Sequence, residues 1–140
     1  MKINNYTLMN SNYDETTGVS TVTINTDVGM FTGTAKCHPD EKYKSKFFGC
    51  QIAEGRALLA YQRELVKIGN AQLTALFNLN TTVCQMRDYK KDNMYTSKIR
   101  RAMYEKQKWI ENIKQKMERT EDAIKKMIIA RDEYAKKVGN

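Results

Sequence analysis

The sequence feature that most constrains the fold is an amphipathic pattern that fills roughly the last forty residues. Apolar side chains recur from Met103 to Tyr134 at spacings of three and four, which places them on one helical face. Between Met103 and Ile110, Lys106 interrupts this stripe with a charge. We therefore predict a helix over residues 97–138, with Thr96 or Ser97 as its N-cap. Such a helix is about 60 Å long, longer than a compact monomer of this size requires, so we expect part of the stripe to pack against a second copy.

A first long helix is predicted over residues 45–82, because the same spacing recurs from Leu58 to Leu79. Gly55 and Gly69 lie inside it, although each Gly costs a helix about 1 kcal/mol relative to Ala. With Ala53 and Ala57 they would let another backbone come close, so we expect tight helix or sheet contacts there. The polar residues 83–96 are predicted to connect the two helices.

The first forty residues are typical of an antiparallel sheet. Val19 to Thr26 is rich in β-branched residues, residues 27–29 supply a turn, and Met30 to Cys37 alternates between apolar and polar side chains. Gly33 in this second strand indicates a bulge, which we favour, or a close approach by another group. The sequence thus predicts a hairpin with one buried face.

The ends of the sheet are less strongly patterned. Residues 3–10 are expected to add an edge strand, with residues 10–18 as its polar connection. The sequence His38-Pro39-Asp40 should end the sheet, because Pro cannot continue a ladder. We therefore predict a single α+β domain over 1–140: a small N-terminal antiparallel β-sheet over residues 1–40, followed by two long antiparallel α-helices that mediate oligomerisation.

The charge of the chain, +8, indicates an anionic partner. From Lys98 to Lys137 there are 13 Lys or Arg against 7 Asp or Glu, a surplus of six on the last helix alone. Such a surplus attracts nucleic acid, an anionic membrane surface or a phosphorylated small molecule, and solubility alone could also select it. No stretch is apolar enough to cross a membrane. The first residues lack the apolar run of a signal peptide, so we expect the chain to stay in the cytoplasm.

Signatures of enzymes and metal sites are mostly absent. Cys37, Cys50 and Cys84 are odd in number and unpaired in spacing, so we expect reduced, buried thiols rather than a disulfide or zinc framework. His38 has no second ligand at metal-binding spacing. No phosphate-binding loop, dinucleotide fingerprint or nucleophile elbow occurs. We expect no catalytic residue, no metal and no cofactor.

A mixture of aromatic and basic residues surrounds the predicted connection between the helices. Aromatic faces stack on nucleobases and Arg binds phosphate oxygens through two hydrogen bonds, so this mixture suits a nucleotide-like ligand. Alternatively, Phe77 and some tyrosines are core residues and the basic ones are merely solvated. The candidates here are Phe77, Met86, Tyr89, Tyr95, Arg100, Arg101 and Tyr104.

Arg56 is a further candidate, because it lies between Gly55 and Ala57 in a run that otherwise looks buried. A buried guanidinium needs an anionic partner. Glu54, Asp40 or a phosphate of a ligand could each supply it, and the sequence does not choose among them.

The segment VGMFTGTAKCHPDEKYKSKFFGCQIAEGRALLAYQRE contains a Phe-x-Gly strand, a His-Pro-Asp turn and a Phe-Gly-x-x-x-Ala-Glu-x-Arg-Ala helix start in that order. It resembles the first-described type of phage Thoeris anti-defence protein, and the likeness covers most of the chain after the first dozen residues. The resemblance implies a non-enzymatic sponge that forms dimers or dimer-based hexamers. The family holds glycocyclic ADP-ribose, the signal of bacterial Thoeris immunity, and some relatives also hold cyclic oligonucleotides.

The resemblance also implies a pocket where two protomers meet, with an aromatic residue on adenine and arginines on phosphates. Phe77 is the best match for the stacking residue, Arg100 or Arg101 for the phosphate clamp, and Arg56 comes next. Two other functions stay open beside the sponge. The basic helix could track a nucleic-acid backbone, or the chain could be a purely structural coiled-coil partner.

Overall fold

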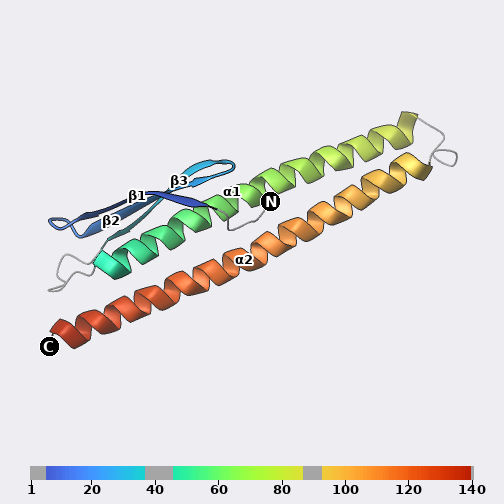
Figure 1. The fold of residues 1–140 in the computed structure, drawn as a ribbon. Coiled ribbons are helices and arrows are strands. Elements are labelled where there is room, and N and C mark those ends of the chain that lie inside the picture. The colour runs from blue at the N-terminus through green and yellow to red at the C-terminus, as the bar shows by residue number, and fades with distance from the viewer. Residues whose placement is uncertain (1–5, 37–45, 87–92, 140) are drawn as a thin grey trace. The chain divides into compact units, whose positions relative to one another are not determined.

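The chain forms a three-stranded antiparallel sheet followed by two long helices in a computed structural model (Figure 1). The structure describes residues 6–36, 46–86 and 93–139, without the side chains of residues 86, 93–95, 138 and 139. The elements, in chain order, are β1 (Thr7–Asp14), β2 (Val19–Thr26), β3 (Gly29–Lys36), α1 (Lys46–Met86) and α2 (Asn93–Gly139). The predicted α+β fold class is therefore confirmed.

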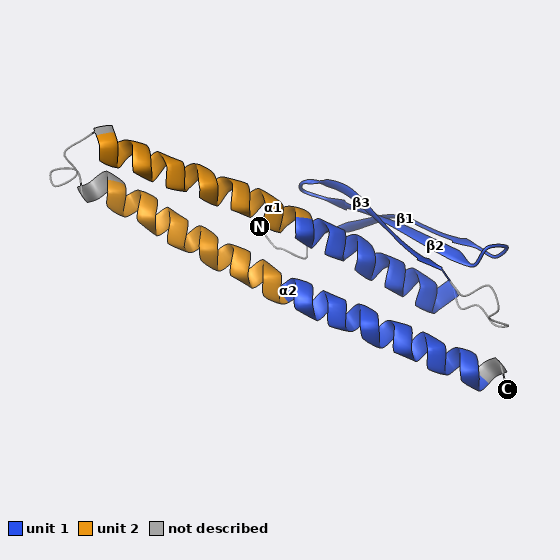
Figure 2. Cartoon of the chain, turned by 180° about the vertical axis from the view of Figure 1, so that it is seen from behind, with its two compact units in different colours: residues 1–63, 116–140 blue, residues 64–115 orange. Residues whose placement is uncertain are grey.

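Two compact units divide the chain, coloured separately in Figure 2. Unit 1 comprises residues 1–63 and 116–140, and unit 2 comprises residues 64–115. Within each unit, the segments of α1 and α2 lie side by side and run in opposite directions (Figures 1 and 2). Unit 1 also contains the sheet. The single-domain organisation stays a prediction.

The strand order is β1-β2-β3, so β2 lies in the centre of the sheet. Both β2 and the turn after it match the prediction. The expected edge strand is confirmed as β1, but its bounds differ from residues 3–10, because β1 runs from Thr7 to Asp14 and includes residues predicted as the polar connection. Residues 3–5 of the predicted strand lie outside the described residues. The polar centre of β1, Asn10 to Asn12, pairs with β2. An edge strand can carry so many polar groups because most of its side chains are exposed.

The structure corrects the prediction of a bulge at Gly33. The register between β2 and β3 is continuous, with Val22 opposite Gly33, and the irregularity of the sheet lies between Leu8 and Asn10 in β1. A Cβ on Gly33 would collide with the Ala53 carbonyl oxygen and lie 2.5 Å from the Ala57 nitrogen. Gly33 is therefore required because the backbone of α1 approaches β3 closely.

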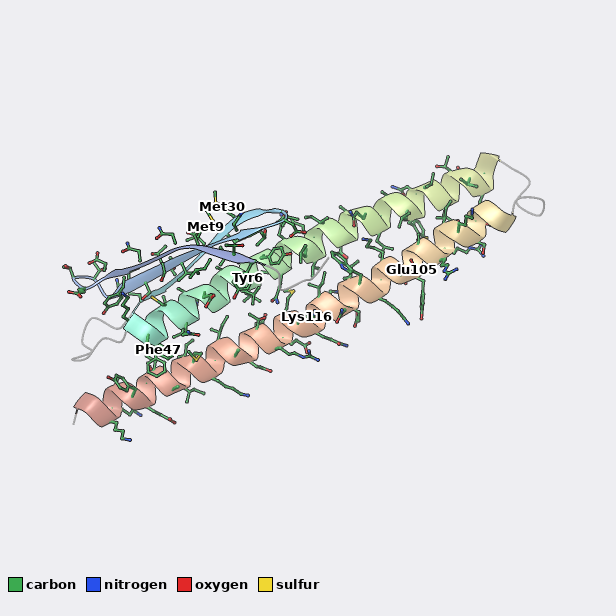
Figure 3. All side chains as sticks on the ribbon, in the orientation of Figure 1. Tyr6, Met9, Met30, Phe47, Glu105 and Lys116 are labelled. Atoms are coloured by element: carbon green, nitrogen blue, oxygen red, sulfur yellow. The ribbon has the colours of Figure 1, made fainter. Side chains whose placement is uncertain are left out.

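The core of unit 1 lies between the sheet and α1. Ser20, Val22 and Ile24 on β2 are fully buried, and the rings of Phe31 and Tyr61 pack with their centroids 5.7 Å apart. The opposite sheet face is exposed at alternate positions of β3, as predicted. Figure 3 shows Met9 and Met30 on that outer face.

Unit 2 is a pair of antiparallel helical segments joined by close contacts. A Cβ on Gly69 would lie 2.8 Å from both Ile110 Cγ1 and Trp109 Cζ3. The predicted tight contacts at small residues are confirmed here, and in unit 1 at Gly55, where the neighbour is Ile124. Lys106, which interrupts the apolar stripe, places its Nζ 4.5 Å from the centroid of the Trp109 ring. This cation–π contact explains a charge in an apolar stripe.

The helix ends differ from the predicted ones. α1 continues to Met86 rather than ending near residue 82, and α2 begins at Asn93 rather than at residue 97. The predicted N-cap at Thr96 or Ser97 is wrong, because both residues lie inside α2 and Thr96 is buried. The prediction from polar composition therefore made the connection between the two helices too long. Among the described residues, no helix is long and apolar enough to cross a membrane.

Candidate functional site

The predicted ligand-binding residues fall in both units. Arg56 lies in unit 1, whereas Phe77, Arg100, Arg101 and Tyr104 lie in unit 2. Tyr89 and the side chains of Met86 and Tyr95 lie outside the described part of the structure.

The four described candidates of unit 2 are solvent-exposed. Phe77 is 59% exposed and Tyr104 55%, so neither is a core residue of this chain. The Arg101 Nε lies 3.4 Å from Glu105 Oε1, and Lys108 Nζ lies 4.7 Å from the centroid of the Tyr104 ring. Both contacts are at the surface, where ion pairs contribute little to stability. These residues present aromatic and cationic groups to solvent, which leaves them available to a ligand or to a second copy.

Arg56 differs from its prediction. The residue is exposed rather than buried, and its Nη1 donates a hydrogen bond of 2.8 Å to the Thr34 carbonyl oxygen. Glu54, one of its predicted partners, instead accepts a hydrogen bond of 3.1 Å from the Tyr6 hydroxyl. Asp40, the other, lies outside the described residues. Because Arg56 has five N–H donors, this single bond leaves others for an anion.

Arg56 lines a cavity of about 700 Å³ in unit 1, which we call the cationic cavity. Its walls come from three elements. β3 contributes Thr32, Gly33 and Thr34; α1 contributes Arg56, Leu59, Ala60 and Arg63; and α2 contributes Glu121, Ile124 and Lys125. This volume lies in the range of about 300–1,000 Å³ typical of small-molecule sites.

The charges of this cavity favour an anion. Arg56, Arg63 and Lys125 carry three positive charges against the one carboxylate of Glu121. Arg56 and Arg63 are seven residues apart, about two turns of α1, so both guanidinium groups lie on the same side of the helix. Two guanidinium groups at this spacing suit a ligand with more than one phosphate oxygen to bind.

β3 adds backbone groups to the cavity. It is an edge strand, and the Thr34 carbonyl that accepts from Arg56 points away from β2. Thr32, two residues earlier, directs its backbone groups the same way. The cavity therefore combines cations with backbone groups of an edge strand, which can recognise the edge of a base or a ribose.

Arg63 and Lys125 were not among the residues predicted from the sequence. The spacing of seven between Arg56 and Arg63 could have revealed the first, since it places both on one helical face. Lys125 comes from a distant part of the chain, and no local pattern distinguishes it from the other lysines of α2.

The described residues include no group of His, Cys, Asp and Glu side chains placed to hold a metal ion. Cys50 and Cys84 are free thiols and are only partly buried. The Ser11 hydroxyl donates a hydrogen bond of 3.4 Å to Cys50 Sγ. Cys37 and His38 fall outside the described ranges.

Comparison with known proteins places the chain in no family. No family model matches it, and neither the curated proteins nor the solved structures contain a match.

Proposed function

We propose that this chain is a phage anti-defence sponge that binds a cyclic ADP-ribose-type signal, glycocyclic ADP-ribose, and holds it without cleaving it. The resemblance of residues 28–64 to Thoeris anti-defence proteins motivates the choice of ligand. The structural observation that carries the proposal is the convergence of Arg56, Arg63 and Lys125 on one cavity. Arg56 belongs both to that segment and to that cavity.

The chemistry of the cavity fits such a ligand. A cyclic ADP-ribose carries two linked phosphates, which the guanidinium forks of Arg56 and Arg63 can bind with charge-assisted hydrogen bonds. Leu59 and Ile124 offer apolar contacts for the base, and the edge strand β3 offers backbone hydrogen-bonding groups. Binding of this kind removes the signal by affinity alone, so the NADase effector of the defence system stays inactive. The protein would act in the cytoplasm of the infected bacterium.

Self-association is a second part of the proposal. Phe77, Leu79 and Tyr104 in unit 2, and Phe47 and Ile129 in unit 1, are large apolar side chains left exposed. Exposed apolar groups of this size favour contact with another protein surface. In a dimer, or in a hexamer built from dimers, Phe77 and Arg100 or Arg101 of one copy would meet the ligand held by another.

Mass spectrometry tests the sponge directly. The protein is incubated with glycocyclic ADP-ribose, freed of unbound ligand and heated. We expect the intact ligand to be released, and we expect the double variant Arg56→Ala/Arg63→Ala to retain far less of it. Lys136→Ala, which removes an exposed charge at the end of α2, is the matched control and should retain the wild-type amount. Release of cleaved products alone would contradict a sponge and favour an enzyme.

Nucleic-acid binding is the alternative, and the basic exposed residues of α2 favour it. Lys108, Lys114 and Lys126 are exposed along this helix. A protein that neutralises a phosphate backbone binds long DNA or RNA with an affinity that falls steeply with salt. Fluorescence anisotropy with a labelled duplex at two salt concentrations separates the two functions, since the sponge should show little such binding.

A further inference from the structure

Unit 1 contains a second cavity, of about 560 Å³, between α1 and α2. It shares only Ile124 with the cationic cavity. Its lining residues on α1 lie at positions 51, 54, 55, 58 and 62, about one helical turn apart, so they form one face of that helix. Leu58, Ala123, Ile124 and Met127 give it apolar walls. We call it the interhelical cavity.

Gln62, at one end of this lining, is the unusual group. Its side chain is 1% exposed, and within the described part of the chain its Oε1 has no hydrogen-bond donor. A buried acceptor without a donor destabilises the folded state, so such groups are rare and each needs an explanation. A donor on a bound molecule would satisfy this oxygen.

Charged groups line the same cavity. Lys116, Arg119 and Lys126 on α2 are opposed by one carboxylate, that of Glu54 on α1. Glu54 is engaged, because the Tyr6 hydroxyl donates to its Oε1 at 3.1 Å, and Figure 3 shows Tyr6 beside α1. Burial first, and the Glu54 charge second, raise the pKa of Tyr6, so the phenol stays protonated as this donor. The lining of this apolar cavity therefore carries a surplus of positive charge.

We infer that the interhelical cavity is a second small-molecule site, for an amphipathic anion that carries an N–H or O–H donor. The apolar body of the ligand packs against Leu58, Ile124 and Met127. Its donor meets Gln62 Oε1, and its acidic group meets the cations of α2. The site needs no residue of the proposed sponge site other than Ile124.

The dye 8-anilinonaphthalene-1-sulfonate is a suitable probe, because it combines an aromatic body, one N–H donor and a sulfonate. We expect saturable binding to the folded protein with one dye per chain, measured by fluorescence titration. N-phenyl-1-naphthylamine, which lacks the sulfonate, should bind about tenfold more weakly. Ala123→Trp should abolish dye binding by filling the cavity.

Gln62→Met gives the sharpest test, because it replaces the acceptor with an apolar side chain of similar size. We expect this variant to bind the dye about tenfold more weakly and yet to have a higher Tm, since an unsatisfied buried acceptor is removed. Gln72→Met, at an exposed position of α1, is the matched control and should change neither quantity. Unchanged dye affinity in Gln62→Met, or dye binding that survives Ala123→Trp, would overturn the inference.

This test is independent of the proposed function. Arg63→Ala should weaken retention of glycocyclic ADP-ribose and leave dye affinity unchanged, whereas Gln62→Met should do the reverse. Loss of dye binding in Arg63→Ala would show that the two cavities are not separate sites and would overturn the inference. If the protein does not retain glycocyclic ADP-ribose but shows the expected dye binding, the proposed function is wrong and the interhelical site is still supported.

Discussion

The Tyr61 hydroxyl, on α1, donates a hydrogen bond of 2.8 Å to Asp27 Oδ1, in the turn between β2 and β3. The ring of Tyr61 is fully buried and packs on Phe31 of β3. One side chain thus fixes the tip of the hairpin and its inner face to the same helix. This contact and the close approach at Gly33 fix the position of β3 on α1. β3 also lines the cationic cavity.

Tyr61→Phe should lower the free energy of unfolding by about 1–2 kcal/mol, because it removes a hydrogen bond to a carboxylate while keeping the ring. Urea denaturation followed by circular dichroism measures the change. Tyr104→Phe, at an exposed position of α2, is the control and should be nearly neutral. Equal stabilities of the wild type and Tyr61→Phe would show that the hydrogen bond contributes nothing.

The same contact predicts a pH dependence. Burial and the bond to Asp27 raise the pKa of Tyr61 from 10.0 to about 12. Since the folded state holds this proton more tightly than the unfolded state, the contribution is complete below pH 10 and is lost as the pH rises through 12. The wild type should therefore lose more stability than Tyr61→Phe between pH 10 and 12. Parallel losses in the two proteins would contradict this assignment.

Gly33→Ala should lower the free energy of unfolding by about 1–3 kcal/mol, because the new Cβ meets the backbone of α1 at Ala53 and Ala57. Backbone atoms cannot turn aside as a side chain can, so the sheet and helix must separate. Thr34→Ala, on the exposed face of the same strand, is the matched control and should cost far less. An unchanged free energy of unfolding in Gly33→Ala would show that β3 and α1 do not pack closely at this position.

Structural features that depend on residues close together in the sequence could be predicted, whereas features that depend on distant residues could not. The alternation of β3 and the spacing of three and four in both helices are local, and they predicted the elements and the small-residue contacts. Gly33 was misassigned because a bulge and a close approach select the same residue, and only the position of Ala53 and Ala57 distinguishes them. The cationic cavity could be predicted only in part. Arg56 is recognisable in the sequence because it lies between small residues, whereas only the fold brings Lys125 to the cavity.

Gly69→Ala should destabilise unit 2 by about 1–3 kcal/mol, because its Cβ would lie 2.8 Å from atoms of Ile110 and Trp109. Trp109 is the one tryptophan of the chain, so tryptophan fluorescence reports the surroundings of this residue alone. We expect a shift of its emission maximum and an earlier unfolding transition. Ala75→Ser, at an exposed position of the same helix, should leave both unchanged. An unaltered emission spectrum in Gly69→Ala would place Trp109 elsewhere.

The two sets of ligand-binding candidates can be separated by their dependence on assembly. Arg63→Ala removes a cation from a cavity within one chain, so it should weaken ligand binding about tenfold or more without changing the native mass. Phe77→Ala should weaken binding only if a second copy brings Phe77 to the ligand. Calorimetric titration with native mass spectrometry of both variants measures the two quantities. Full affinity in Arg63→Ala would exclude the cationic cavity as the site.

Ile129→Glu tests whether the apolar residues of α2 mediate self-association. Ile129 is 57% exposed on α2, and a carboxylate buried in an interface would lack a partner. We expect the native mass to fall to that of a smaller species, while the circular dichroism spectrum keeps its helical content. Asn112→Glu adds the same charge at another exposed position of α2 and should leave the mass unchanged. An unchanged mass in Ile129→Glu would show that this part of α2 is a solvated surface, and assembly would then have to use Phe77 and Tyr104 in unit 2.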